Sequence, residues 1–159
     1  MRLVSLLFII DGDKVLLGKK KVRFGAGYWN GFGGGVEKGE TIEEGTCREA
    51  KEESGLTIRP EDLKKVGHII FRFVDKPEYD EDAYIFITNK YSGEPVETEE
   101  MFPQWYELKN LPISEMWPSD VEWVPLVLQE NKTIEATCYF LGTEKPFTVG
   151  KFEFKEVEF

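Results

Sequence analysis

The first forty residues contain two apolar segments separated by a polar turn. Residues 3–10 and 14–18 are mostly aliphatic, and Asp11-Gly12-Asp13 lies between them. An Asp-Gly turn flanked by apolar segments is typical of a β-hairpin. We therefore expect the chain to begin with two paired strands.

Further apolar segments predict more strands downstream. Residues 66–74 and 83–89 are rich in β-branched and aromatic side chains and are joined by a charged loop, so we expect them to pair. Residues 104–108 predict another short strand. The tail, residues 133–159, predicts two strands around 142–146, because Phe152 and Phe154 alternate with charged residues.

Two segments carry helix signals. Thr41 followed by Glu44 is a capping box, and Gly55 is a natural C-terminal stop, which predicts a helix between them. Gly45 inside this helix costs about 1 kcal/mol relative to alanine, which indicates close packing or a geometric demand there. Residues 118–130 predict a second helix, in which Pro125 favours a late start or a kink.

Length and charge restrict the class of protein. The 159 residues, 41% of them hydrophobic, suit one globular domain. Thirty acidic against twenty basic residues give a net charge of −10, which argues against binding to a nucleic acid polymer. Binding of one small anionic ligand is compatible with this net negative charge if cations screen the electrostatic field of the protein.

The two cysteines, Cys47 and Cys138, belong to no metal-binding pair, and free thiols in a reducing cytoplasm are expected. The apolar start is followed by the Asp-Gly-Asp turn without a small-residue cleavage site, so a strand is expected rather than a secretory signal. No apolar run approaches the roughly 20 residues of a membrane span, so no membrane partner is expected.

Three glutamates define the first candidate site. Glu49, Glu52 and Glu53 are spaced i, i+3 and i+4 on the first predicted helix, so their carboxylates share one face. The alternative to a site is a solvated acidic face. Because every candidate ligand is an oxygen, a cation bound here would be hard, Mg²⁺ or Mn²⁺. Arg48 can pair with Glu44 or Glu52 one turn away and orient a carboxylate.

The loop at residues 24–35 is rich in glycine and aromatic residues. It fails the dinucleotide motif G-x-G-x-x-G at its last position, and no P-loop motif is present. Gly33–Gly35 can let the backbone approach a phosphate or a metal, although glycines also form ordinary tight turns. Lys19, Lys20, Lys21 and Arg23 precede the loop and could hold a triphosphate, or serve as solubilising residues at a strand edge.

Other residues could complete a nucleotide site. Glu97, Glu99 and Glu100 form a second acidic cluster that could supply one more carboxylate or be an exposed loop. Trp29-Asn30 and the segment Trp117-Pro118-Ser119-Asp120 offer flat faces and polar groups for a purine, although a single Trp is more often a core residue than a ligand contact. His68, the only histidine, lies in a predicted strand and is expected to be structural.

Residues 34–56 resemble the Nudix box. Gly34, Glu40, Arg48-Glu49, Glu52-Glu53 and Gly55 stand at the spacing of the catalytic helix in Nudix hydrolases, enzymes that split nucleoside diphosphates linked to another moiety. Segments 15–20, 24–34 and 66–73 extend the likeness to the mammalian-type MutT homologues, which hydrolyse oxidised purine nucleoside triphosphates. Glu100-Met101, Met116-Trp117-Pro118 and Trp123 continue it in the same order.

This resemblance implies an α+β fold, an α/β/α sandwich around a mixed sheet, with one Nudix domain over residues 1–159. It implies a monomer that hydrolyses a small-molecule nucleotide with Mg²⁺, or with Mn²⁺. The implied metal ligands are the Gly33 carbonyl, Glu49, Glu52, Glu53 and Glu100. The implied catalytic residues are Arg48, Glu52, Glu53 and Glu100. The implied phosphate contacts are Lys20, Gly33, Gly34 and Gly35. The implied base contacts are Ser5, Asn30, Phe32, Phe71, Trp117, Pro118, Ser119 and Asp120.

Two residues depart from the family pattern. The acidic pair that reads the base is here Ser119-Asp120, so one carboxylate is missing, and the choice between 8-oxo-guanine and 2-hydroxy-adenine stays open. Ala50 stands where the box usually carries a larger apolar residue, and this departure affects only the packing of the helix. Three functions therefore stay under consideration: hydrolysis of oxidised purine triphosphates, hydrolysis of another nucleoside diphosphate derivative or of unmodified dNTPs, and non-catalytic binding.

Overall fold

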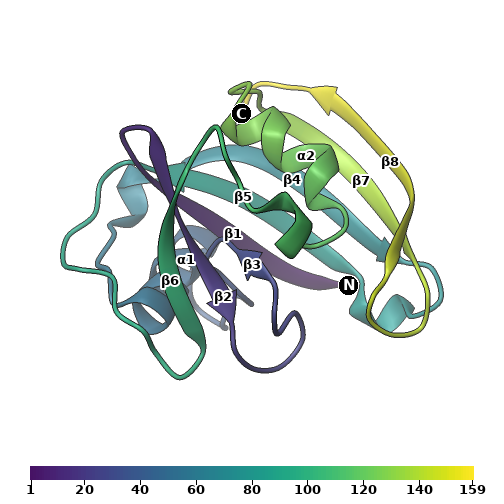
Figure 1. The fold of residues 1–159 in the computed structure, drawn as a ribbon, viewed down its shortest axis with the longest axis horizontal. Helices are drawn as coiled ribbons and strands as arrows, with labels where there is room; N and C mark the ends of the chain where they lie inside the picture. The colour runs from purple at the N-terminus through teal and green to yellow at the C-terminus, as the bar shows by residue number, and fades with distance from the viewer.

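A computed structural model describes all residues from 1 to 159 and contains one eight-stranded sheet (Figure 1). The elements in chain order are β1 (Arg2–Asp11), β2 (Lys14–Lys20), β3 (Trp29–Asn30), α1 (Ile42–Ser54), β4 (Lys64–Phe73), β5 (Glu81–Thr88), β6 (Met101–Glu107), α2 (Asp120–Leu128), β7 (Ile134–Leu141) and β8 (Thr148–Glu156). Short 3-10 turns lie at η1 (Pro60–Asp62), η2 (Pro77–Tyr79) and η3 (Ile113–Glu115). Neither α-helix is long and apolar enough to cross a bilayer.

The sheet is mixed. Its strand order is β3-β2-β1-β5-β4-β7-β8, and β6 pairs with β2 off this path. β1 runs parallel to β5 and β4 parallel to β7, whereas the other pairs are antiparallel. The hairpin of β1 and β2, the pairing of β4 with β5, and the two strands of the tail confirm the strand predictions.

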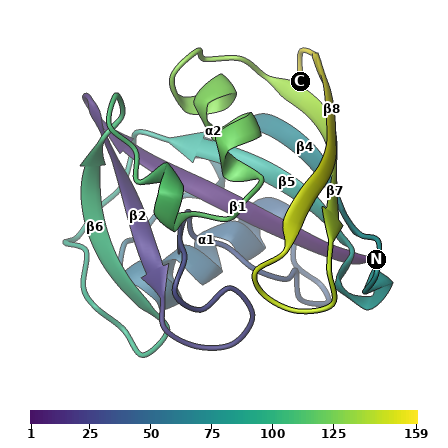
Figure 2. The same cartoon turned by 45° about the vertical axis from the view of Figure 1, so that its right-hand side comes forward.

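Both faces of the sheet are covered, as the turned view in Figure 2 shows, with α2 in front and α1 behind. Along β1, Val4 and Phe8 pack in the core on the side of α2, while Leu7 and Ile9 pack on the side of α1. This alternation explains the nearly continuous apolar sequence of β1, because both of its faces are buried. The predicted α/β/α sandwich is confirmed.

Helix α1 begins and ends where its caps predict. The Thr41 hydroxyl accepts a hydrogen bond from the Glu44 N–H at 3.1 Å, and Glu44 Oε1 accepts one from the Thr41 N–H at 2.8 Å. Gly55 ends the helix in the left-handed region with φ of 81°. A Cβ on Gly45 would lie 2.7 Å from Glu40 Oε1, which is the close packing that a glycine inside the helix indicates.

Helix α2 lies within the predicted range of residues 118–130, so this helix is confirmed. It begins at Asp120 and continues through Pro125, so of the two alternatives for this proline the late start is wrong and the kink stays a prediction. Pro125 has no N–H to donate to the carbonyl of Val121 one turn earlier. Val121 is 57% exposed, which lets water satisfy that carbonyl and makes the proline tolerable.

Candidate active site

Three carboxylates from two distant segments meet at one end of α1. Oxygen atoms of Glu49, Glu53 and Glu100 all lie within 4.8 Å of one another. Glu49 and Glu53 are one helical turn apart on α1, and Glu100 immediately precedes β6, which pairs along the length of β2. Glu53 Oε1 also accepts a hydrogen bond from the Gly33 N–H at 2.9 Å, which ties the cluster to the glycine loop.

Burial makes this cluster electrostatically unfavourable by itself. Glu53 is only 4% exposed, and its burial, with the nearby charges of Glu49 and Glu100, raises the pKa of its carboxyl from 4.5 to about 8. Burial also raises the pKa of Glu49. Such groups favour a bound cation, because an opposite charge restores the ionised form.

The donor set fits a hard divalent cation. Every ligand in the cluster is an oxygen, which suits Mg²⁺ or Mn²⁺ better than zinc. A Cβ on Gly34 would lie 2.9 Å from the carboxyl carbon of Glu49, so glycine lets the loop backbone approach the cluster without displacing that carboxylate. The residues of this chain are therefore suited to hold such an ion.

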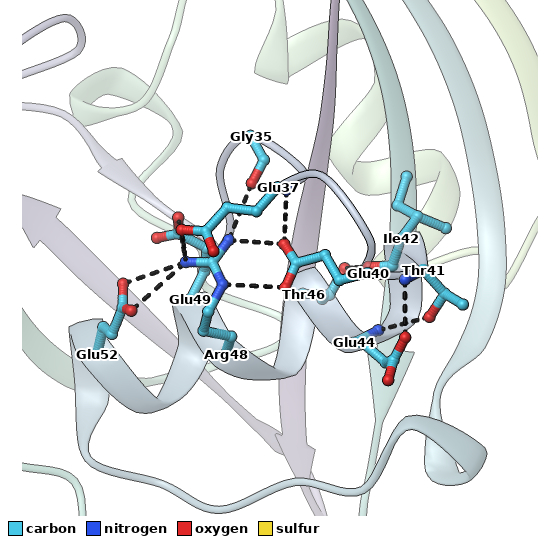
Figure 3. Close-up of polar contacts among 10 residues, drawn as sticks. All are labelled: Gly35, Glu37, Glu40, Thr41, Ile42, Glu44, Thr46, Arg48, Glu49 and Glu52. Carbon is cyan, nitrogen blue, oxygen red and sulfur yellow. Dashed lines mark hydrogen bonds and ion pairs between the residues drawn. The ribbon is translucent and has the colours of Figure 1, made fainter.

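Arg48 organises the carboxylates around it (Figure 3). Its guanidinium donates to both oxygens of Glu40, at 2.8 and 3.1 Å, and to the Gly35 carbonyl at 3.2 Å. It also donates to Glu49 Oε1 at 3.1 Å, which holds that carboxylate in place. The hydrogen bonds with Glu40 raise the pKa of Arg48 and lower that of Glu40. We infer that Arg48 orients Glu49 within the cluster.

Glu52 lies outside the carboxylate cluster. Its half-exposed carboxylate accepts from Arg48 Nη1 at 3.4 Å, so the prediction that Arg48 pairs with Glu52 is confirmed. The alternative partner, Glu44, is used by the capping box instead. The metal and catalytic roles of Glu52 stay predictions.

A cleft of about 390 Å³ extends from the carboxylate cluster across the sheet towards the start of α2. It brings together most of the residues for which the sequence predicts a role. Those lining it are Ser5, Lys20, Asn30, Gly33, Gly34, Glu49, Glu53, Phe71, Glu100, Trp117, Ser119 and Asp120. One continuous site therefore joins the predicted metal and base ends.

Some predicted residues do not line the cleft: Arg48, Glu52, Gly35, Phe32 and Pro118. Phe32 is fully buried in the core on the α1 side, because its bridge to Leu7 turns the ring towards the face that Leu7 occupies. A base contact by that ring is therefore not available in this arrangement. Gly35 contributes through its carbonyl, which Arg48 binds.

The far end of the cleft contains a buried acid and several unsatisfied polar atoms. Asp120 is 2% exposed, its Oδ2 accepts from the Trp117 N–H at 3.1 Å, and burial raises its pKa from 3.8 to about 8. The hydroxyls of Ser5 and Ser119 are buried without a hydrogen-bond partner. The Trp123 indole N–H lies towards Asp120 without reaching hydrogen-bond geometry. Buried polar atoms left unpaired in one cleft indicate a polar ligand.

An aromatic wall closes this end. The ring of Trp117 lies 5.0 Å from that of Tyr28, 5.2 Å from Phe24 and 5.7 Å from Phe140, measured between centroids. Phe24 and Tyr28 belong to the aromatic loop at residues 24–35, but nothing in the sequence indicated a role for either ring.

Polar residues were missed as well. Arg2 and Glu81 line the cleft although the sequence indicated no role for them, and of the basic run before the loop Lys20 and Arg23 line it. Glu40 was absent from the predicted site residues although it belongs to the box, and this membership was the signal that could have identified it.

We expect a divalent cation to stabilise the protein more at high pH than at low pH. Without metal, Glu53 has a higher pKa in the folded than in the unfolded chain, so the folded state loses stability as pH rises from 4.5 to about 8. Protons also compete with metal for this carboxyl below about pH 8. Thermal denaturation with Mg²⁺ or EDTA should show a larger rise in Tm at about pH 9 than at about pH 6. An equal rise at both values would contradict the assignment of Glu53, and Glu53→Gln is the control that should abolish the difference.

The fold and the site together are those of a metal-dependent hydrolase, with two of its three clustered carboxylates on one helix. The comparisons agree: the family model of the NUDIX domain matches residues 1–127. The mouse protein named oxidized purine nucleoside triphosphate hydrolase is 45% identical over 157 residues, covering 99% of this chain and 96% of the relative. A zebrafish (Danio rerio) protein of the same name is 47% identical over 131 residues, 82% of each chain. The chain belongs to the Nudix family and is a pyrophosphohydrolase.

A solved structure agrees with the fold. The MutT protein from Bacillus halodurans superposes with a TM-score of 0.81 over 97% of both chains at 22% identity. This likeness extends through β7 and β8, which lie beyond the residues matched by the family model.

Proposed function

We propose that this chain hydrolyses oxidised purine nucleoside triphosphates to the monophosphate and diphosphate. The observation that carries the proposal is a single cleft with a carboxylate cluster at one end and a buried, unsatisfied polar pocket beneath aromatic rings at the other. A nucleoside triphosphate has the matching layout, with its charged phosphates and its flat polar base at opposite ends. The names of the mouse and zebrafish relatives support the same substrate class.

At the phosphate end, the ion is proposed to be Mg²⁺, or Mn²⁺, held by Glu49, Glu53 and Glu100 with the predicted help of Glu52 and the Gly33 carbonyl. When bound, it would neutralise phosphate charge and lower the pKa of the attacking water. Lys20 lines the cleft beside the cluster and is proposed to bind phosphate. Gly33 and Gly34 keep the loop backbone close to the same place. Among Glu52, Glu53 and Glu100, a carboxylate that accepts the proton of water serves as general base.

At the base end, Asp120 supplies the adaptable group. With a pKa of about 8 it is protonated at neutral pH, so its carboxyl both donates and accepts hydrogen bonds. Asn30 Oδ1 accepts from the Gly31 N–H at 2.8 Å, which leaves the Asn30 NH₂ group to donate to the ligand. An 8-oxo-purine presents an N7–H donor beside an O8 acceptor, whereas an unmodified purine has only the N7 acceptor. Groups able to donate and accept suit the oxidised edge.

A second candidate keeps the reaction and changes the substrate to another nucleoside diphosphate derivative or to unmodified dNTPs. Ser119 favours it, because a hydroxyl stands where the family has a second carboxylate. Non-catalytic binding is disfavoured, because Glu49, Glu53 and Glu100 are all retained and converge.

Initial rates on 8-oxo-dGTP, 2-hydroxy-dATP and dGTP separate these candidates. We expect kcat/KM for at least one oxidised substrate to exceed that for dGTP by about tenfold or more, because buried polar groups left unpaired penalise the wrong base. Release of diphosphate rather than single phosphates, followed by chromatography, identifies the cleaved bond. A preference for plain dGTP would overturn the first candidate.

Three further statements belong to this proposal. We take residues 1–159 as one domain, because a single sheet includes strands from Arg2 to Glu156. We propose that the protein acts as a monomer in the cytoplasm. The free thiols of Cys47 and Cys138 fit a reducing compartment. Light scattering after size exclusion tests the monomer, and microscopy of a tagged chain tests the location.

A further inference from the structure

Glu81 is an acidic residue on an otherwise largely apolar part of the cleft floor. It opens β5 two residues before Ala83 and four before Ile85, whose side chains belong to the core on the α2 side. Because side chains alternate along a strand, Glu81 lies on the same face as Ala83 and Ile85. Glu81 lines the cleft together with them. A carboxylate in this position is unusual unless something binds it.

No protein group satisfies this carboxylate. Its one charged partner is Arg2, with Nη1 at 3.9 Å, and no hydrogen bond is formed. The Glu81 side chain is 25% exposed, whereas that of Arg2 is 65% exposed and largely in solvent. Burial raises the pKa of Glu81, and the positive charges of Arg2 and Lys20 act in the opposite direction. A partly buried acceptor without a donor is costly, so a ligand that brings a donor would bind favourably here.

The sheet register places Glu81 between the two ends of the site. Arg2, Glu81, Phe71 and Cys138 form one row across β1, β5, β4 and β7, with neighbouring strands about 4.8 Å apart. On the phosphate side, the charge of Lys20 acts on the carboxyls of both Glu53 and Glu81. On the base side, two residues beyond Cys138 on β7, Phe140 packs against Trp117.

We propose that Glu81 is a specificity-determining residue, whose carboxylate accepts a hydrogen bond from the nucleoside part of the substrate. The donor is either a sugar hydroxyl or an N–H of the base, since these groups of a nucleotide lie between the phosphates and the far edge of the purine. This inference rests on the proposed function, because it takes the ligand to be a nucleotide. Glu81 is not among the residues for which the sequence predicts a ligand contact.

The test compares Glu81→Met and Glu81→Gln with wild type on triphosphates of two oxidised purines, 8-oxo-guanine and 2-hydroxy-adenine, each carrying ribose, deoxyribose or 2′,3′-dideoxyribose. Methionine removes the acceptor and keeps the bulk, while glutamine keeps a carbonyl that can accept. For a substrate that carries the sugar hydroxyl or base N–H that donates to Glu81, we expect KM to rise about tenfold to a hundredfold in Glu81→Met. Glu81→Gln should recover part of this loss. Glu78→Met, at an exposed glutamate in the preceding turn η2, is the matched control and should behave as wild type.

The substrates separate the two sources of the donor. A loss that shrinks as sugar hydroxyls are removed assigns the contact to the sugar. A loss that is the same for all three sugars but differs between 8-oxo-dGTP and 2-hydroxy-dATP assigns it to the base. An unchanged KM, or a uniform loss across every substrate with a lower Tm, would overturn the proposal. The same substrate pattern in Arg2→Met would also overturn it, because Glu81 would then act by holding Arg2.

Failure of the proposed function is distinguishable from failure of this inference. Absence of turnover by wild type on the whole panel refutes the hydrolase proposal and leaves Glu81 to be tested by binding. Titration calorimetry with the matching nucleoside monophosphates then compares wild type with Glu81→Met. Equal affinities would reject the contact, and a weakened affinity that follows the sugar or the base would support it.

Discussion

Replacing Glu53 by glutamine is expected to lower kcat on the order of a thousandfold, with the fold preserved. Glutamine keeps the shape of the side chain and can still accept the hydrogen bond from the Gly33 N–H. It removes the negative charge at the most buried of the three clustered carboxylates, where a cation needs it most. Steady-state rates in saturating Mg²⁺, with circular dichroism to confirm folding, measure the effect.

Although Glu53→Gln should lose activity, its thermal stability without metal should rise at high pH. Above about pH 8 the wild-type chain without metal carries a buried charge on Glu53, and glutamine relieves it. We therefore expect Glu53→Gln to have the higher Tm in EDTA at about pH 9 and little advantage at about pH 5. Glu43→Gln, on the same helix and outside the cluster, is the control and should change neither activity nor the pH profile. Unchanged turnover in Glu53→Gln would remove Glu53 from the metal site.

The part of the site on α1 could be predicted because its signals are local. The capping box and Gly55 mark the ends of the helix within the sequence itself, and the i, i+4 spacing then places Glu49 and Glu53 on one face. Helical spacing predicted only one of the partners that Arg48 has, Glu52. Glu40, its strongest partner, lies eight residues earlier and becomes a neighbour only after the loop folds back over α1.

Residues brought together by strand pairing were harder to predict. Glu100 joins the cluster because β6 pairs along β2, a long-range contact that the short apolar pattern of residues 104–108 did not reveal. Glu81 lies in the acidic run Asp80-Glu81-Asp82, whose composition is typical of a solvated loop. Only the parallel register of β1 with β5 shows that Glu81 faces the cleft while Asp82 turns to the other face and binds His68.

Phe32 is the opposite case, a residue for which the sequence predicted a base contact and whose ring the fold places in the core. Its place in a glycine-rich loop beside Asn30 gave no indication of which way the ring would point. The bridge to Leu7 decides this and turns the ring into the core beneath α1. Sequence could therefore identify the segments of the cleft, while the pairing of those segments decides which residues line it.

Substitution of Asp120 is expected to have the largest effect on substrate selection. Asp120→Ala removes a donor and acceptor from the base pocket, and we expect kcat/KM for an oxidised purine triphosphate to fall about a hundredfold or more. Alanine also leaves the Trp117 N–H without its partner, so part of the loss could reflect local unfolding. Asp120→Asn avoids this difficulty, because its carbonyl can still accept from Trp117.

The asparagine variant also tests the protonation state of Asp120. The wild-type pKa of about 8 predicts that the neutral acid is the form present at neutral pH, and that substrate affinity changes as pH rises through that value. Asparagine cannot ionise, so this part of the pH profile of kcat/KM should disappear in Asp120→Asn. The asparagine side chain also cannot exchange its donor with its acceptor by moving a proton. Relative to wild type, Asp120→Asn should therefore lose activity on 8-oxo-dGTP and on 2-hydroxy-dATP to different extents.

Stability gives an independent measure of the same group. Asp120 binds its proton more tightly in the folded chain than in the unfolded one, so wild type loses stability as pH rises from about 4 to about 8. The Tm of Asp120→Asn relative to wild type should therefore increase between about pH 6 and about pH 9. Asp13→Asn, at an exposed turn residue between β1 and β2, should show no such trend. A constant difference between Asp120→Asn and wild type over this range would mean that Asp120 is ionised in the folded protein, and a neutral acid could then not be the group that recognises the base.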